Sequence, residues 1–286
     1  MNNMSKKQYE VLNWASLFLE KNNRERRVAD LLLQHHLGVN RTQYFAQMRE
    51  DIPREVIERF QEDIMNHVET GVPVQHLIGY EEFYGRKFFV NNHVLIPRQE
   101  TEELVQRIIS QTAKDIPVTI VDVGTGSGII ATTLALEIPH ATVYATDISQ
   151  EALRTAERNA NNLQARVTFL QGDFLAPVIA EQIQADMVVS NPPYISEAER
   201  PELSDTVVNF DPELALFAKD NGLAAYKQIV KQLHHVMKPG GLVAFEIGYL
   251  QGEDVKQIIN EEFPYVTVTV EKDMNGKDRM VFATGF

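Results

Sequence analysis

The chain has 286 residues, of which 44% are hydrophobic and 23% are charged, as in ordinary globular proteins. This length allows one large α/β domain and a smaller second domain. The absence of cysteine excludes disulfide bonds and thiolate catalysis. The formal net charge is −13, and after residue 90 there are 27 acidic against 15 basic residues, a balance of −12. Proteins that grip nucleic acid backbones need positive charge, so we expect no nucleic acid binding.

The first ten residues contain no apolar segment of the kind found in secretion signals. No uninterrupted apolar stretch is long enough to span a bilayer. These features favour a cytoplasmic protein without a membrane anchor. The eight histidines show no spacing typical of metal ligands, so we expect no metal site.

Residues 1–71 predict a small helical bundle. Apolar clusters flanked by charges recur in this region, and Trp14 is expected to fill the core between the helices. From Pro53 onward, apolar side chains follow helical spacing as far as Val68. Proline in the first turn and Gly71 just past the end are both common at helix boundaries.

Residues 72–96 predict a β-hairpin linker, because apolar and aromatic residues stand on either side of a Gly-Arg-Lys turn. Residues 97–286 form the predicted catalytic domain. At its start, Arg98, Glu100, Thr101 and Glu102 suit the cap and first turn of a helix, where acidic side chains are favoured.

A glycine-rich turn follows the first strand predicted in the catalytic domain. Residues 118–123 are apolar enough for a buried parallel strand, and a helix is predicted after the turn. Glycine suits a sharp turn against which a ligand lies. The spacing G-x-G-x-G departs from the G-x-G-x-x-G of dinucleotide binders. The candidate cofactor-binding residues of this turn are Gly124, Thr125, Gly126, Ser127 and Gly128.

Two further predicted strands are each followed by an acidic residue at the same edge of the sheet. Residues 141–146 lead into Asp147, whose carboxylate can accept both hydroxyls of a ribose. Residues 167–171 precede Asp173 and Phe174, an acid that can accept from an adenine amino group and an aromatic ring that can flank the base. Each acid alone could instead cap the following helix. Together they predict a ligand site at the carboxyl edge of an open α/β sheet.

The next predicted strand, residues 185–190, ends in Asn191, Pro192, Pro193 and Tyr194. Proline has no N–H and a fixed φ, so the segment is stiff and leaves carbonyl groups free as acceptors. The Asn191 side-chain oxygen and the Pro192 carbonyl can each accept one N–H of an –NH2 group, while Tyr194 covers its flat face. This arrangement suits methylation of a planar nitrogen, which is a poor nucleophile and must be positioned. The alternative is a turn that merely contains two prolines.

Strand and helix alternate from residue 118 onward, which predicts a doubly wound, mainly parallel sheet. The Lys-Pro-Gly-Gly segment 238–241 ends a predicted helix, and residues 242–248 are another buried strand. Two final strands, residues 265–270 and 279–284, flank Asn-Gly, a hairpin signal. An antiparallel terminal hairpin distinguishes the methyltransferase form of this sheet from the dehydrogenase form.

The chain resembles the class I S-adenosylmethionine-dependent methyltransferases, and specifically the peptide chain release factor glutamine N5-methyltransferases. The Asn-Pro-Pro-Tyr element is shared with adenine and cytosine amino methyltransferases, whereas Ile-Pro-Arg-x-x-Thr-Glu together with a helical N-terminus is more specific. Glu100 and Asp211 stand where the family usually has Asp and Glu, respectively. The resemblance rests on residues 71–79, 83–85, 94–102, 122–128, 191–194 and 211–216.

The resemblance implies that S-adenosylmethionine is the cofactor and that its methyl group passes to the side-chain nitrogen of the glutamine in the Gly-Gly-Gln motif of release factors. It also implies that the segment from Arg98 lies beside the active site, which is compatible with a helix cap. The implied catalytic residues are Asn191, Pro192 and Tyr194, and the implied substrate-binding residues are Asn191, Pro192, Pro193 and Tyr194. The implied cofactor-binding residues are those of the glycine turn with Asp147, Asp173, Phe174 and Asn191.

Selection of one glutamine among many requires a surface wider than the site, so we expect residues 1–71 to dock the release factor. We expect a cytoplasmic monomer. The alternative activity is methylation of adenine-N6 or cytosine-N4 in nucleic acid, which needs a basic cleft or a target-recognition domain. A non-catalytic binding module would be expected to lack Asp147 or Asn191, and both are present.

Overall fold

The computed structural model describes residues 6–113 and 115–286, and it divides into two compact units. The first unit comprises the chain up to Gly79 together with residues 205–210, and the second comprises the remainder. The predicted absence of a secretion signal concerns residues 1–5 in part, and these lie outside the described residues. Within the described part, no helix has both the length and the apolar character needed to cross a membrane.

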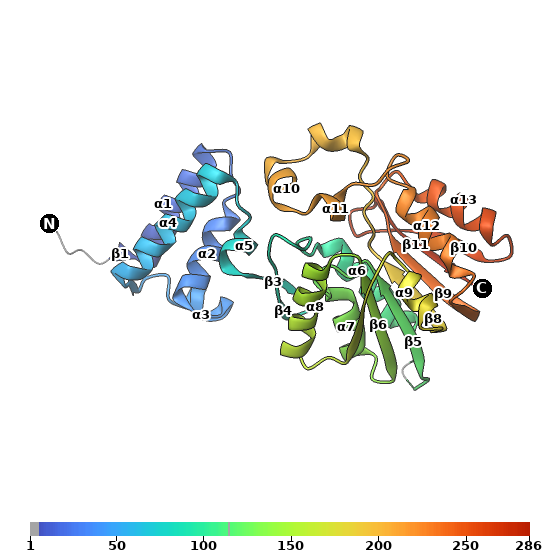
Figure 1. The fold of residues 1–286 in the computed structure, drawn as a ribbon. Helices are drawn as coiled ribbons and strands as arrows, with labels where there is room; N and C mark the ends of the chain where they lie inside the picture. Colours follow the sequence, from blue (N-terminus) through green and yellow to red (C-terminus); the bar gives the residue numbers. More distant parts are fainter. Residues whose placement is uncertain (1–5, 114) are drawn as a thin grey trace. The chain divides into compact units, whose positions relative to one another are not determined.

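The first unit is a bundle of helices with a short two-stranded ribbon (Figure 1). Its core consists of apolar side chains such as Leu19, Leu32 and Phe60, which are fully buried. The expectation that Trp14 fills this core was wrong, because its ring is 38% exposed and stacks on Phe18 with centroids 5.6 Å apart. The elements are β1 Lys6–Lys7, α1 Gln8–Lys21, α2 Arg27–Leu37, α3 Arg41–Ala46, β2 Asp51–Ile52, α4 Arg54–Thr70, α5 Val74–Ile78 and α10 Asp205–Phe210.

Helix α4 has the boundaries that its sequence predicts. Pro53 immediately precedes the helix, and Gly71 ends it in a left-handed conformation with φ +78°. The apolar residues at helical spacing, Ile57, Phe60 and Ile64, all face the core. Helical spacing therefore sets which face of α4 is buried.

Helix α10 belongs to the first unit although its sequence lies between elements of the second. The Arg24 guanidinium donates two hydrogen bonds to the Asp205 carboxylate, at 3.1 and 3.0 Å. The Thr206 hydroxyl donates to the Gly71 carbonyl at 3.1 Å. The Asp205 carboxylate also lies in the first turn of α10, where negative charge is favourable. These bonds complete the first unit with residues from far along the chain.

The second unit is a seven-stranded sheet with helices on both faces, preceded by a two-stranded hairpin (Figure 1). The hairpin strands are β3 Tyr80–Phe83 and β4 Arg86–Phe89. The sheet strands are β5 Val118–Val123, β6 Ala141–Asp147, β7 Val167–Gln171, β8 Ala185–Ser190, β9 Met237–Glu246, β10 Thr267–Lys272 and β11 Asp278–Thr284. The helices are α6 Gln99–Gln111, α7 Ile129–Glu137, α8 Gln150–Asn162, α9 Ala176–Ala180, the 3-10 helix Glu197–Glu202, α11 Glu213–Leu216, α12 Ala224–Leu233 and α13 Gly252–Glu262.

The strands lie in the order β10-β11-β9-β8-β5-β6-β7. Neighbours from β9 to β7 pair in parallel, whereas β11 pairs antiparallel with both β9 and β10. The predicted mainly parallel sheet with an antiparallel terminal hairpin is thereby confirmed. The chain order reverses at β5 and β8, and open α/β sheets bind ligands outside the carboxyl ends of strands at such a point.

Alternating strand residues build two separate cores, because successive side chains of a strand point to opposite faces. Val188 on β8 packs with α12 and α13, and its neighbours Met187 and Val189 pack with α6 and α7. On β9, Phe245 faces α12 and Ala244 faces α6. This alternation determines which face each polar side chain at the strand ends must take.

Two sequence-predicted segments differ in detail from the structure. Residues 72–96, predicted as a hairpin linker, begin with the short helix α5, and the hairpin itself packs into the core of the second unit through Phe83 and Phe88. Strand β9 begins at Met237 and so includes the Pro-Gly-Gly segment that was predicted to end a helix, and α12 ends at Leu233. Pairing with the edge of β8 extends the strand, with a shift of register near Ala185.

Replacing Gly128 by alanine should destabilise the protein more than the same change at Gly240. Both glycines have φ +79°, so both variants carry the cost of a left-handed alanine, about 1–2 kcal/mol. A Cβ at Gly128 would lie 2.8 Å from the Ala156 Cβ, whereas nothing lies within 4 Å at Gly240. Overpacking should add about 1–3 kcal/mol to the loss in Gly128→Ala. Urea unfolding measures this difference, and equal losses would show that α7 and α8 are not in tight contact.

Candidate active site

The sequence-predicted site residues follow strands whose carboxyl ends lie level in the sheet. Val123 at the end of β5 pairs with Thr146 on β6 and with Ser190 on β8. The Ser190 hydroxyl donates to the Val123 carbonyl at 2.6 Å, which ties the ends of β5 and β8 together. The glycine turn, Asp147 and Asn191 therefore start from the same edge of the sheet.

The three glycines of the turn have different surroundings. At Gly124 and Gly126, both with positive φ, nothing lies within 4 Å of an added Cβ, so a ligand has access to the backbone. Gly128 instead faces Ala156 of α8, which gives it a packing role. Thr125 and Ser127 are buried: the Thr125 hydroxyl donates to the Asp122 carboxylate at 2.6 Å, and the Ser127 carbonyl accepts from the Asn159 amide. These two residues shape the turn from inside.

Asp147 connects the glycine turn to the end of β6. Its carboxylate accepts the backbone N–H of Gly126 and of Ser149, each at 2.9 Å. Burial raises the pKa of Asp147, and these N–H donors counteract the rise. The Ser149 side chain caps α8, so Asp147 is not the helix cap. A carboxylate offers about four lone-pair sites, and Asp147 therefore retains capacity to accept ribose hydroxyls.

Asp173 and Phe174 follow β7 at the same edge. The Asp173 carboxylate is exposed and accepts from the Gln228 side chain at 2.8 Å. Phe174 has a left-handed backbone with φ +48°, and its half-buried ring packs against the core cluster on the α12 face. The sequence thus located both residues at the edge, but it did not reveal that the core supports the ring.

Asp122 is a fully buried acid two residues before Gly124, the first residue of the glycine turn. Burial raises its pKa to about 7, against the opposing effect of hydrogen bonds from Thr125 and from the Ala131 N–H. Its second carboxylate oxygen, Oδ1, has no hydrogen-bond partner among the described residues. This unpaired acceptor, the open space at the turn and the carboxylate of Asp147 together fit a ligand that carries hydroxyl and ammonium donors, as S-adenosylmethionine does.

The Asn-Pro-Pro-Tyr segment begins where β8 ends. Asn191 is half-buried, and its side-chain Nδ2 donates to the Thr101 hydroxyl at 3.3 Å. Pro192 is buried, and within the described chain its carbonyl accepts no hydrogen bond. The Tyr194 ring packs against the core cluster on the α12 face. The structure therefore brings the Asn191 side chain and a free Pro192 carbonyl together at the sheet edge.

Gln251 and Gly222 hold the segment that follows, and no local sequence pattern indicates either role. The Gln251 side chain donates to the Tyr194 carbonyl at 2.9 Å and accepts from the Gly248 N–H at 3.0 Å. A Cβ at Gly222 would lie 2.0 Å from the Tyr194 carbonyl oxygen, so only glycine allows this approach. The backbone after Asn191 is consequently fixed on two sides.

The segment that begins at Arg98 forms the cap position and first turn of α6, as one of its two interpretations predicts. Arg98 precedes α6, and Glu100 lies in the first turn of the helix. The Arg98 guanidinium also forms an ion pair with the buried Asp211 carboxylate at 3.0 Å. Burial raises the pKa of Asp211, and the charge of Arg98 opposes the rise. The same segment carries Thr101, which contacts Asn191.

Glu246 is a second buried acid at this edge, at the end of β9 and only 1% exposed. The Thr101 hydroxyl donates to its Oε2 at 2.7 Å. The apolar pattern of residues 242–248 indicates a buried strand and does not by itself single out Glu246. A lone acid at the end of an apolar strand was the signal that could have identified it.

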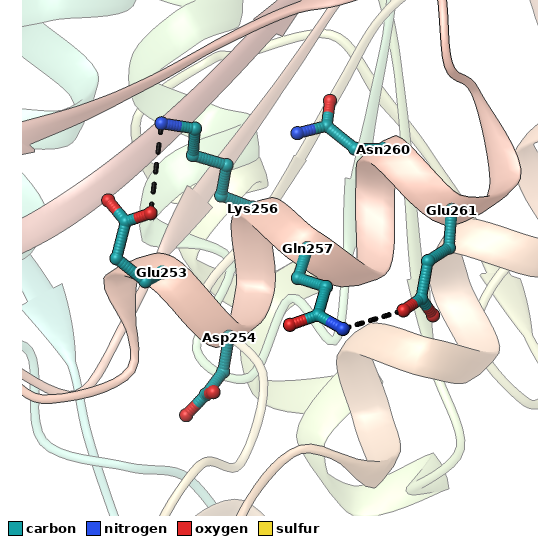
Figure 2. Close-up of a pocket in the computed structure, with 6 residues that line it drawn as sticks. All are labelled: Glu253, Asp254, Lys256, Gln257, Asn260 and Glu261. Carbon is teal, nitrogen blue, oxygen red and sulfur yellow. Dashed lines mark hydrogen bonds and ion pairs between the residues drawn. The ribbon is translucent and has the colours of Figure 1, made fainter.

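Figure 2 shows the side chains that line a pocket on α13. All of its lining residues lie on this one helix, and pairs of them bind each other: Lys256 contacts Glu253 at 3.7 Å and Gln257 donates to Glu261 at 2.7 Å. It contains none of the predicted site residues, so we place the candidate active site at the strand ends.

The strand order, the glycine turn and the acids at successive strand ends define a class I S-adenosylmethionine-dependent methyltransferase. Residues 10–79 match the family model described as PrmC N-terminal domain, and residues 99–211 match the methyltransferase small domain. The chain belongs to the release factor glutamine methyltransferase family.

Two relatives show this membership over nearly the whole chain. The release factor glutamine methyltransferase of Bacillus cereus is 47% identical over 278 residues, which are 96% of this chain and 98% of the relative. The enzyme of the same name from Bacillus subtilis is 47% identical over 279 residues, 96% of each chain. Among solved structures, the hMettl16 catalytic domain in complex with MAT2A 3'UTR hairpin 6 matches 82% of each chain with 16% identity and a TM-score of 0.53, a likeness of fold alone.

Replacing Asp147 by alanine should weaken binding of S-adenosylmethionine by roughly 1–3 kcal/mol, because hydroxyl groups of the ligand lose their acceptor. Asp186→Ala is the matched control: Asp186 also accepts a backbone N–H, that of Thr119 at 2.7 Å, but it lies near the opposite end of the strands. The control should lower thermal stability without changing cofactor affinity. Calorimetry measures both affinities, and an unchanged affinity in Asp147→Ala would remove Asp147 from the cofactor site.

Proposed function

We propose that this protein transfers the methyl group of S-adenosylmethionine to the side-chain amide nitrogen, N5, of the glutamine in the Gly-Gly-Gln motif of peptide chain release factors. The observation that carries the proposal is the pair of acceptors at the end of β8: the Asn191 side-chain oxygen and the Pro192 carbonyl, which accepts no hydrogen bond within the described chain. Membership of the release factor glutamine methyltransferase family supports the choice of substrate.

The cofactor supplies an electrophilic methyl group on a positively charged sulfur. The protein must then orient a weak nucleophile, since the lone pair of an amide nitrogen is delocalised. Asn191 and Pro192 each accept one N–H of the substrate amide, which fixes its plane and draws electron density toward the nitrogen as the N–C bond forms and the methyl–sulfur bond breaks. S-adenosylhomocysteine leaves with the bonding electron pair, and the methylated amide releases one proton to water. Pro192 is buried and both prolines have fixed φ, so the acceptors are held in place before the substrate binds.

We assign cofactor binding to the glycine turn and the strand-end acids. Gly124 and Gly126 allow close approach of the ligand, and Asp147 accepts ribose hydroxyls. Asp173 accepts from the adenine amino group, with Phe174 beside the ring. Asn191 adjoins both the cofactor and the substrate. In this assignment, the end of each successive parallel strand binds one part of the cofactor.

A nucleic acid base could present the same –NH2 group to these acceptors, so the substrate must be tested directly. Purified protein with S-adenosylmethionine and a bacterial release factor should add 14 mass units, a single methyl in place of hydrogen, to the Gly-Gly-Gln peptide. Adenine- and cytosine-containing oligonucleotides should remain unmodified. Peptide mass spectrometry distinguishes these outcomes, and methylation of the oligonucleotides alone would refute the proposal.

Replacing Asn191 by alanine should lower turnover roughly a hundredfold or more, because an acceptor used in the transition state is lost. Some loss of cofactor affinity is also expected, since Asn191 adjoins the cofactor. Asn162→Ala, at an exposed position where α8 ends, is the matched control and should keep full turnover. Rates are measured with saturating release factor and cofactor. Wild-type turnover in Asn191→Ala would exclude Asn191 from catalysis.

We also propose that the first unit docks the release factor. Helix α1 presents Trp14 and Leu17 to solvent, 38% and 51% exposed, and Trp14 stacks on Phe18 of the same face. Exposed apolar side chains that gather on one face of a helix often mark a protein interaction site. A folded partner offers such a surface, whereas a free glutamine peptide does not.

The double variant Trp14→Ala with Leu17→Ala should lower kcat/KM for the folded release factor roughly tenfold, as expected when exposed aromatic and aliphatic anchors are removed from an interface. Its kcat/KM for a free Gly-Gly-Gln peptide should not change. The control is Ile116→Ala, which removes a side chain that is 62% exposed in the second unit. Steady-state kinetics on both substrates provide the test. Equal losses on the peptide and on the folded protein would contradict a docking role.

A further inference from the structure

A hydrogen-bond chain of three side chains leads from the buried acid at the end of β9 to Asn191, the proposed substrate acceptor after β8. Glu246 accepts a hydrogen bond from the Thr101 hydroxyl at 2.7 Å, and the Thr101 oxygen accepts one from Asn191 Nδ2 at 3.3 Å. Thr101 is 1% exposed and Glu246 is 1% exposed, so no bulk water competes for either group. This hydrogen-bond chain joins α6, β9 and the end of β8.

The direction of these hydrogen bonds is set by the acid. An ionised carboxylate can only accept, so the single hydroxyl proton of Thr101 must point to Glu246. The lone pairs of the Thr101 oxygen are then available to the Asn191 NH2 group. When the NH2 end of a carboxamide faces inward, its oxygen, Oδ1, faces the other way. This hydrogen-bond chain therefore selects the orientation of the Asn191 carboxamide that substrate binding requires.

We infer that Glu246, acting through Thr101, is the positioning residue that sets the orientation of the Asn191 side-chain amide so that Oδ1 faces the glutamine substrate. The inference rests on the proposed role of Asn191 as a substrate acceptor. It adds a role for two residues that do not touch the substrate. A carboxamide whose ends are exchanged would present NH2 to the substrate NH2, and the acceptor would be lost.

The charged and titratable neighbours of Glu246 lie on α6, β11, α12 and the segment after β8. Burial raises its pKa to about 7, while the Thr101 hydroxyl, the positive charge of Arg279 on β11 and the Asn191 side chain lower it. The charge of Glu100 on α6 raises it. Two tyrosines complete the surroundings: the hydroxyl of Tyr226 on α12 donates to the Glu246 carbonyl at 2.8 Å, and Tyr194 follows β8.

Protonation of Glu246 reverses the donor and acceptor roles in this hydrogen-bond chain. The protonated acid can donate to the Thr101 oxygen, which frees the Thr101 hydroxyl to donate to Asn191 Oδ1. Because the carboxylate is the active form, turnover should be highest above pH 7 and should fall as the pH decreases through about 7. The pKa of Asp122 is also raised to about 7, so the acidic limb is assigned to Glu246 by comparing the pH profiles of the wild type and of Glu246→Gln.

Three variants test the inference, all in the full-length protein with saturating cofactor. Thr101→Val keeps the shape of the side chain and removes the hydroxyl, so kcat should fall roughly tenfold to a hundredfold, the scale expected for a misplaced catalytic group, while KM for the release factor stays unchanged. Thr101→Ser restores the hydroxyl and should recover most of kcat. Glu246→Gln can still accept from Thr101 but does not titrate, so it should retain part of the turnover and lose the acidic limb of the pH profile.

Thr133→Val is the matched control, because Thr133 is also buried in a helix and its hydroxyl has no hydrogen-bond partner within the described chain. It should leave kcat and the pH profile unchanged. Thermal melts of all variants separate loss of fold from loss of the Asn191 orientation. If Thr101→Val unfolds, Thr101→Ser and Glu246→Gln still test the inference. Equal kcat in Thr101→Val and wild type, or an acidic limb with an unchanged midpoint in Glu246→Gln, would overturn the inference. Failure of the wild type to methylate the release factor would instead refute the proposed function.

Discussion

The parallel pairing of β5 with β6 on one side and β8 on the other is the constraint on which the rest of the site depends. Its register sets Val123 level with Thr146 and with Ser190, so the residues that follow all three strands start from one line. These residues are far apart in the sequence. A shift of one residue in either ladder would turn alternate side chains to the opposite face and separate the glycine turn from Asp147 or from Asn191.

The buried acids Asp122 and Glu246 belong to the same side of this sheet. Asp122 and Glu246 each alternate with residues that face α12, so both face α6 and α7. Burial of a carboxyl group is unfavourable unless donors compensate it, and each acid has a threonine hydroxyl and a further contact for this purpose. Natural proteins depart from apolar cores mainly where function requires it. The departures here stand beside the glycine turn and beside Asn191.

Local sequence signals predicted the sheet and its edge residues well, because strand periodicity, glycine turns and proline stops act over a few residues. Strands β5 to β8, the boundaries of α4 and the terminal hairpin were all visible in this way. Contacts between distant segments left no such signal. Thr101 and Glu246 are 145 residues apart, and Gln251 and Tyr194 are 57 apart. Trp14 failed as a core prediction because an aromatic residue in an amphipathic helix can also lie at the border of the buried face.

Helix α10 has a consequence for the order in which the protein is made. Asp205 is synthesised 181 residues after its partner Arg24, and at bacterial and eukaryotic translation rates this interval is roughly 10 to 35 s. During that time the first unit has left the ribosome without the helix that completes it, and the Arg24 guanidinium and the Gly71 carbonyl lack their later partners, Asp205 and Thr206. The bundle at the N-terminus therefore reaches its final form only after most of the catalytic sheet has been translated.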